Sequence, residues 1–239
     1  PSLDPFLLKE HLRLNGFEGS ETAPGAWLEE LLLNVERVAL GDARLALTMP
    51  SGEQREFGLD LALSREGSHR RLEGRLGTSR GMELTALGEG VGNPFEPGSF
   101  TGQLYLNVAS ADVAALTEFM PDAPATLRVD GRLDLELWTS WYKGEPTTAL
   151  RVAMEDVLLQ ASDTSWQLAL DSIGFDAGID SHEDGWLLTV SALEAARGEA
   201  LFELPRLQLD LRGETMDLRA LNLPLAPLVE LLAGSEVLS

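Results

Sequence analysis

The sequence predicts a mostly β protein: a long, antiparallel, strongly twisted sheet with a few short helices. Three observations lead to this prediction. Apolar and polar residues alternate with a period of two in many segments, turn residues separate these segments, and helical periodicity is rare. Strands follow one another without intervening helices of crossover length, so the pattern is that of a meander and not of βαβ units.

The alternation defines one apolar side of each predicted strand. It is clearest over residues 132–141, where leucine occupies every second position from Leu133 to Leu137 and the residues between are mostly charged. Residues that fall on the apolar side, and that we select as a candidate apolar lining, are Leu45, Leu47, Leu59, Leu61, Leu84, Leu104, Leu106, Leu133, Leu135, Leu137, Leu150, Val152, Leu168, Leu170, Leu188, Leu207, Leu209 and Leu211.

Turn chemistry separates the predicted strands. Glycine, proline, aspartate and serine cluster at residues 50–53, 65–68, 142–146 and 183–185, and residues 88–94 and 96–98 form one longer predicted loop. Several intervals between turns exceed about ten residues, which at roughly 3.3 Å per residue gives strands longer than about 30 Å. Such strands are long for an ordinary sandwich.

Helices are predicted over residues 26–34, 110–120 and 224–233. In the second, Ser110 or Asp112 is expected to cap the free amides and Pro121 to end the helix; in the third, Leu225, Leu228 and Leu232 form a stripe that ends at Gly234. Each of these two helices follows a leucine-alternating strand, which suggests a weak repeat. We therefore expect a first strand set ending in a short helix (1–121) and a second (122–239), joined in one continuous sheet. The opening Pro1 suggests a fragment of a longer protein.

Charge and composition exclude several classes of partner. Hydrophobic residues make up 44% of the chain, and 18 basic residues face 39 acidic ones, for a net charge of −21. Nucleic-acid binding requires clustered Lys and Arg, so no nucleic-acid partner is expected. Docking on an anionic membrane leaflet favours polybasic segments and is also disfavoured.

Residue types that commonly carry catalysis do not form a recognisable site in this sequence. The chain has no cysteine, and His11, His69 and His182 lack metal-ligand spacing. Asp134 and Glu136 share one side of a predicted strand, about 7 Å apart at Cα, but on the polar side, where a solvated charged face is the simpler interpretation. We predict no enzyme activity, no catalytic residue, no metal and no cofactor.

An apolar sheet face must be covered, and the sequence leaves open what covers it. Periodicity by itself favours a closed sandwich or barrel, with the leucines in an ordinary core, over an open, curled sheet that holds acyl chains. The tryptophans leave a similar choice. Trp138 and Trp141 fall on opposite sides of one strand, and such residues either pack the sheet or form a sugar platform or a lipid-interface belt.

Several segments resemble a known family. Residues 41–47, 100–108 followed by 112–120, 129–138 and 221–228 combine leucine alternation with glycine and helix punctuation. From about Val35 onward the chain is similar to the middle region of YhdP-like proteins, members of the AsmA-like group of Gram-negative envelope proteins that is related to TamB.

This resemblance implies a fold and a function. Members are anchored in the inner membrane by an N-terminal helix, and their β-sheet curls through the periplasm into a groove that is apolar inside and polar outside. They are thought to move phospholipids between the inner and outer membranes and so to support the outer-membrane barrier. The resemblance thus implies that this chain is a periplasmic segment, that phospholipid acyl chains are its partners, and that the eighteen residues above line the groove.

Overall fold

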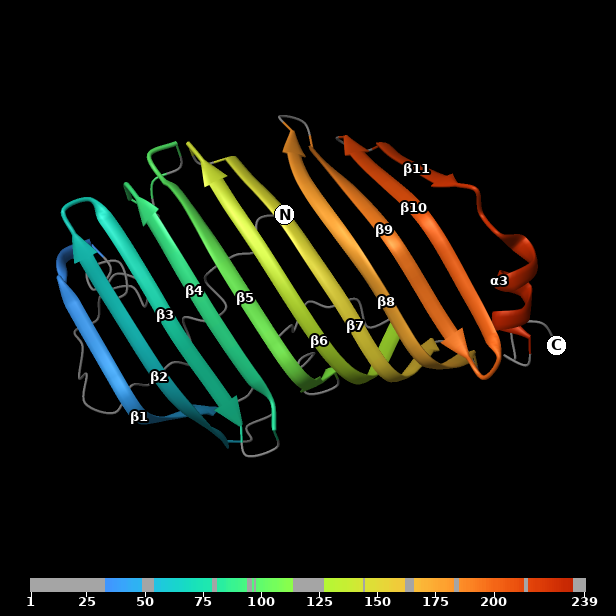
Figure 1. Cartoon of the computed structure of the whole chain (residues 1–239), viewed down its shortest axis with the longest axis horizontal. Helices are drawn as coiled ribbons and strands as arrows, with labels where there is room; N and C mark the ends of the chain where they lie inside the picture. The colour runs from blue at the N-terminus through green and yellow to red at the C-terminus, as the bar shows by residue number, and fades with distance from the viewer. Residues whose placement is uncertain are drawn as a thin grey trace.

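The computed structural model contains one antiparallel sheet of eleven strands, in which each strand pairs with the next along the chain. The structure describes residues 33–48, 54–78, 81–93, 96, 98–113, 127–143, 145–161, 166–182, 185–212 and 215–233. The sheet extends from β1 at one edge to β11 at the other, with α3 beyond β11 (Figure 1).

The elements follow strict chain order. The strands are β1 (Arg37–Thr48), β2 (Gln54–Glu66), β3 (His69–Thr78), β4 (Glu83–Val91), β5 (Thr101–Asp112), β6 (Leu127–Tyr142), β7 (Glu145–Ala161), β8 (Gln167–His182), β9 (Gly185–Arg197), β10 (Ala200–Arg212) and β11 (Thr215–Leu221), and the helix is α3 (Leu225–Leu232).

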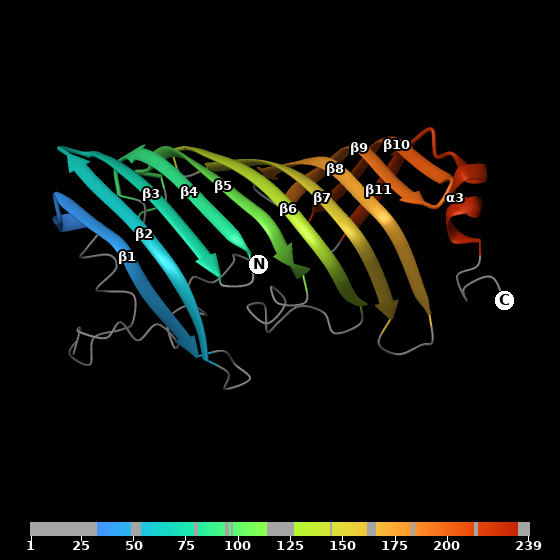
Figure 2. The same cartoon turned by 60° about the horizontal axis from the view of Figure 1, so that its bottom comes forward.

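The predicted fold class is confirmed: the protein is mostly β, in one long, twisted antiparallel sheet. β1 and β11 do not pair with each other, so the sheet is not closed on itself, and the alternative of a closed barrel is wrong. A second sheet, as a sandwich would need, does not occur in the part of the chain that the structure describes. Turned by 60°, the sheet forms a twisted arch (Figure 2).

The strands are long, as the spacing of the turns predicts. β6, β7 and β8 contain 16, 17 and 16 residues. At roughly 3.3 Å per residue, β7 extends over about 56 Å. Strands of this length give each face several side-by-side rows of residues.

Four strands carry an irregular residue in their interior. Asp42 in β1, Ser110 in β5, Asp156 in β7 and Ala192 in β9 have φ values of 51–53°, which non-glycine residues rarely adopt. The register of the sheet shifts next to each of them. These are β-bulges, which bend a strand and increase its twist.

Carboxylates on the neighbouring strand stabilise two of these bulges. The backbone N–H of Asp42 donates to Asp60 Oδ1 at 2.9 Å, and that of Ser110 donates to Asp134 Oδ1 at 2.7 Å. Each bulge leaves a donor outside the regular ladder, and the carboxylate satisfies it. The same device therefore occurs at β1–β2 and at β5–β6.

Two predicted boundaries are wrong, and the first of them lies at a bulge. Ser110, expected to cap a helix, lies within β5, which continues to Asp112 before the helical Val113. The rest of that predicted helix, and all but the last two residues of the one expected at 26–34, lie outside the described residues. The predicted loop at 88–94 also begins too early, because Gly88 and Gly90 belong to β4.

The third predicted helix is confirmed, with a different buried side. α3 packs on β10 and β9, and its buried residue is Leu231, with Leu228 and Leu232 partly buried beside it. Leu225, expected on the stripe, is 66% exposed. Arg197 of β9 donates from Nη1 to the carbonyl oxygens of Leu231 and Ala233, which fixes the end of the helix against the sheet.

The conformation of Gly131 yields a stability prediction. Its φ is 144°, and an added Cβ would lie 3.0 Å from the Glu155 carbonyl oxygen at the β7 bulge. We expect Gly131→Ala to lower the free energy of unfolding by about 1–3 kcal/mol, measured by urea denaturation. Gly178→Ala in β8 is the matched control, because a Cβ there meets nothing closer than 4.0 Å. Equal losses in the two variants would contradict this account of the bulge.

Candidate functional site

A single row of apolar residues crosses the whole sheet. Following the register from strand to strand, each member is directly paired with the next, and every one is apolar or glycine. The row consists of Leu40, Leu61, Gly74, Ala86, Leu106, Leu137, Leu150, Ala177, Val190, Leu207 and Ala220. Strands are about 4.8 Å apart, so ten steps make a path of about 48 Å across the strands.

Parallel rows flank this one on the same face. One side has Val38, Leu63, Leu72, Gly88, Leu104, Thr139, Thr148, Ile179, Leu188, Leu209 and Leu218; the other has Ala43, Leu59, Leu76, Leu84, Val108, Leu135, Val152 and Phe175. Directly opposed residues in an antiparallel pair point to the same face. The result is an apolar face, the surface formed by these three rows.

Twelve of the eighteen candidate lining residues of the sequence analysis belong to these three rows, and six are outside them: Leu45, Leu47, Leu133, Leu168, Leu170 and Leu211. Leu45 pairs with Phe57, and Leu211 pairs with Trp186 and Met216. Leu168 and Leu170 pair with Leu159 and Val157 at the far end of β7 and β8. Leu47 is in β1. The structure therefore brings most of the selected residues into common rows, while their role as a lipid lining stays a prediction.

Alternation alone missed several members of the rows, namely Leu40, Leu72, Leu76, Phe175, Ile179 and Leu218. β3 was missed because arginine and glycine dominate it, and β11 because it is short. Near the bulges the apolar parity changes, as between Met154 and Val157 in β7, so a strict period of two fails there.

Most of the apolar face is only half buried. Of the sixteen candidate lining residues whose side chains the structure describes, fourteen are half-buried, and only Leu168 and Leu170 are buried, at 6% and 5% exposure. A core residue of a globular domain is normally covered from both sides. Within the described residues, no second layer covers the centre of this face.

A well-buried cluster lies at the α3 end. Val157, Leu168, Leu170, Ala195, Phe202, Leu204 and Leu231 pack together there. The helix packs mainly on β10 and β9, and Leu207 of the central row packs against the cluster to which the helix contributes Leu231. Elsewhere most members of the three rows are half-buried, while Leu63, Val108 and Ala177 are buried, at 4%, 8% and 6% exposure.

Polar side chains occur at one place in the three rows. Thr139 and Thr148 face each other across β6 and β7, and their hydroxyl oxygens are 3.1 Å apart. The two hydroxyls therefore satisfy part of each other's hydrogen-bonding capacity.

The opposite face is charged, and its charges pair with one another. Arg151 of β7 contacts Asp176 of β8 at 2.9 Å and Glu136 of β6 at 3.5 Å. The hydrogen bond and charge of Asp176 raise the pKa of Arg151 above its ordinary value, so the guanidinium stays charged. Exposed pairs of this kind add little stability, but they keep this face hydrated.

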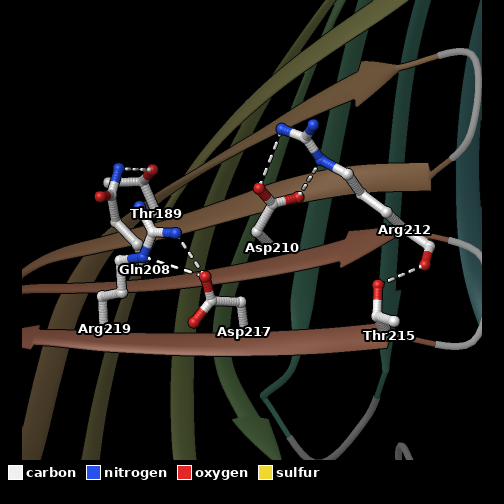
Figure 3. Close-up of polar contacts among 7 residues, drawn as sticks. All are labelled: Thr189, Gln208, Asp210, Arg212, Thr215, Asp217 and Arg219. Carbon is white, nitrogen blue, oxygen red and sulfur yellow. Dashed lines mark hydrogen bonds and ion pairs between the residues drawn. The ribbon is translucent and has the colours of Figure 1, made fainter.

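The same chemistry continues to the β11 edge (Figure 3). Asp210 of β10 and Asp217 of β11 stand directly opposite, where two like charges repel. Each is neutralised within its own strand, Asp210 by Arg212 at 3.0 Å and Asp217 by Arg219. The bond to Asp217 raises the pKa of Arg219. Ion pairs on the charged face therefore extend to β11, the strand at which the apolar rows of the opposite face also end.

The acidic residues considered as a catalytic pair have structural partners. Asp134 accepts the bulge N–H of Ser110, and Glu136 accepts from Tyr105 Oη at 3.4 Å and pairs with Arg151. Groups of three or more potential metal ligands do not occur among the described residues. In that same part of the chain, no helix has the length and apolar character required to cross a bilayer.

Comparison with known proteins adds no family to these observations. Neither the models of known protein families, nor the curated proteins, nor the solved structures contain a match to this chain.

The difference between core and face can be measured. Leu170→Ala, in the buried cluster, should lower the free energy of unfolding by about 2–4 kcal/mol. Leu150→Ala, in the half-buried centre of the apolar face, should cost about 1 kcal/mol or less, because less area returns to water and no closed cavity forms. Both are measured by urea denaturation of the whole chain. A larger loss for Leu150→Ala than for Leu170→Ala would mean that the centre of the face is sealed.

Proposed function

We propose that this chain is a periplasmic segment of an AsmA-like bridge protein, and that its apolar face holds and conducts phospholipid acyl chains between the inner and outer membranes. The observation that carries the proposal is the unbroken row from Leu40 to Ala220, which crosses all eleven strands. The family resemblance of the sequence supports the same function. The full-length protein would be anchored in the inner membrane.

Half burial of most of the row supports a ligand and not a sealed core. Leucine and valine side chains left partly in water gain about 25 cal/mol for each Å² that an apolar partner covers. An acyl chain would supply that cover at about 0.8 kcal/mol for each methylene removed from water. Such a surface is stable when lipid is present and remains accessible when it leaves.

Uniformity of the row supports movement along it. From Leu106 through Leu137 to Leu150 each step offers an aliphatic side chain of similar size, and charged groups lie on the other face. An acyl chain therefore meets no polar group that would hold it at one position, and successive sites have similar affinity. Conduction needs repeated modest binding of this kind, because a single deep site would trap the lipid.

The open edges allow headgroups to stay in water. β1 and β11 are unpaired with each other, so the apolar face is not enclosed by a continuous wall. The chain's net charge of −21 disfavours lingering contact with anionic headgroups. Acyl chains would lie on the apolar face while the polar ends remain outside it. The proposal includes no catalytic step, metal or cofactor.

Site-specific photocrosslinking tests the proposal. A photoreactive phenylalanine analogue at Leu106 or Leu135, both on the apolar face, should form covalent adducts with phospholipid when the chain is produced in the periplasm of a Gram-negative cell. The same analogue at Gln103 or Asn107, on the opposite face of β5, is the matched control and should give few adducts. Adduct masses identify the lipid. Equal labelling of the two faces, or labelling of protein alone at Leu106 and Leu135, would refute the proposal.

A charge placed on the apolar face gives a second test. Leu135→Glu should abolish phospholipid co-purification, detected by native mass spectrometry, while circular dichroism shows the sheet retained, because the side chain is half-buried and can reach water. Glu136→Gln, the next residue and on the other face, should leave bound lipid unchanged. Unfolding of Leu135→Glu would show instead that the row is a closed core.

A further inference from the structure

A short apolar strip interrupts the charged face. Leu87 of β4, Tyr105 of β5, Trp138 of β6 and Ala149 of β7 are paired in sequence across four strands, on the face opposite the apolar rows. Their neighbours along each strand in the same face are polar or charged, such as Glu89, Gln103 and Ser140. The strip is therefore not a continuation of the apolar face.

The two aromatic rings lie side by side, with Trp138 exposed and Tyr105 half-buried. The ring centroids of Tyr105 and Trp138 are 5.4 Å apart and the rings are tilted by 40°. The Tyr105 hydroxyl donates to Glu136 at 3.4 Å, which fixes its ring. Trp138 is 41% exposed, and Leu87 is 45% exposed. Ala149, the direct partner of Trp138 on β7, is too small to cover the indole.

A hollow of about 540 Å³ lies over this strip. Its lining includes Leu87, Tyr105 and Trp138, together with the side chains of Arg71, Glu89 and Gln103. That volume is within the range of small-molecule sites. The hollow is on the other face of the sheet from the proposed lipid path.

Polar groups at the border of the hollow are already oriented. Gln103 Nε2 donates to Glu89 Oε1 at 2.6 Å, and Arg71 pairs with Glu73 at 2.8 Å. Ser140 and Thr147 add hydroxyl groups on the far side. Each carboxylate, amide and guanidinium retains further hydrogen-bonding capacity toward solvent, since Glu accepts at both oxygens and Arg carries five N–H groups.

The charge balance favours an uncharged ligand. Arg71 is offset by Glu73, and Glu89 is the remaining charge of the hollow, with one oxygen bonded to Gln103. A phosphate or carboxylate ligand would lack an uncompensated cation to bind. A ligand with an apolar ring face and polar groups around its rim would satisfy both the exposed rings and the border groups.

We propose that this hollow is a carbohydrate-binding site, in which a pyranose ring stacks on Trp138 and Tyr105 and its hydroxyls bond to Glu89, Gln103 and Arg71. The C–H groups of one sugar face cover the indole, and the equatorial hydroxyls reach donors and acceptors at the border. The site is separate from lipid conduction, because its side chains are on the opposite face of the same strands.

Isothermal titration calorimetry with defined oligosaccharides tests this site. The probes are cellotetraose and chitotetraose, each titrated to about 10 mM to detect weak binding. We expect one site with at least one probe. Trp138→Ala should weaken binding about tenfold or more through loss of the stacking surface. Tyr142→Ala is the matched control: this aromatic is 65% exposed on the same strand but outside the hollow, and its loss should leave affinity unchanged.

Several outcomes would overturn the site. No heat with either sugar, an affinity unchanged in Trp138→Ala, or an equal loss in Tyr142→Ala would each refute it. Binding of choline chloride without binding of sugar would show an aromatic site for a cation instead. Lipid adducts at Leu135 should persist in Trp138→Ala, so failure of this site and failure of lipid conduction give different results.

Discussion

The structure depends on the cross-strand register, which keeps the apolar residues of eleven strands on one face. A shift of one residue between two strands would move every leucine of one of them to the other face. The bulges at Asp42, Ser110, Asp156 and Ala192 each insert a residue into this register. Beyond each bulge the apolar residues lie on the same face as before it. Asp60 and Asp134 accept hydrogen bonds from the backbone N–H groups that two of the bulges leave outside the regular ladder.

Because of this register, the two faces of the sheet differ in chemistry: one is apolar and the other is charged. The apolar face is closed by α3 at one end, where Leu231 completes a buried cluster, and is half-exposed over its centre. The opposite face holds ion pairs such as Arg151 with Asp176, and one strip in which Trp138 is exposed beside Tyr105. Because much of the apolar area of this sheet is not buried in the protein's own core, that area is available for a ligand. This is the physical basis of the proposed lipid path.

Open edges complete the comparison with ordinary β proteins. Sandwiches and barrels hide their apolar faces against another layer or within a closed wall. Here the rows instead end at β1 and β11, and Met216 and Leu218 of β11 are 67% and 60% exposed. On the polar side of β11, Asp217 and Arg219 form an ion pair. On its apolar side, Met216 and Leu218 are not covered by other described residues.

The sequence by itself determined the fold class, the meander order and most of the apolar face, because the period of two and the turn residues are local properties. It also placed the last helix. It did not determine β3 or the positions beyond each bulge, because arginine and glycine mask the pattern in β3 and a left-handed residue such as Asp156 reverses the parity. Only the tertiary structure decided that the sheet stays open, which strand residues stand opposite one another, and that Trp138 is exposed beside Tyr105. Those properties arise from pairing between strands that no local pattern specifies.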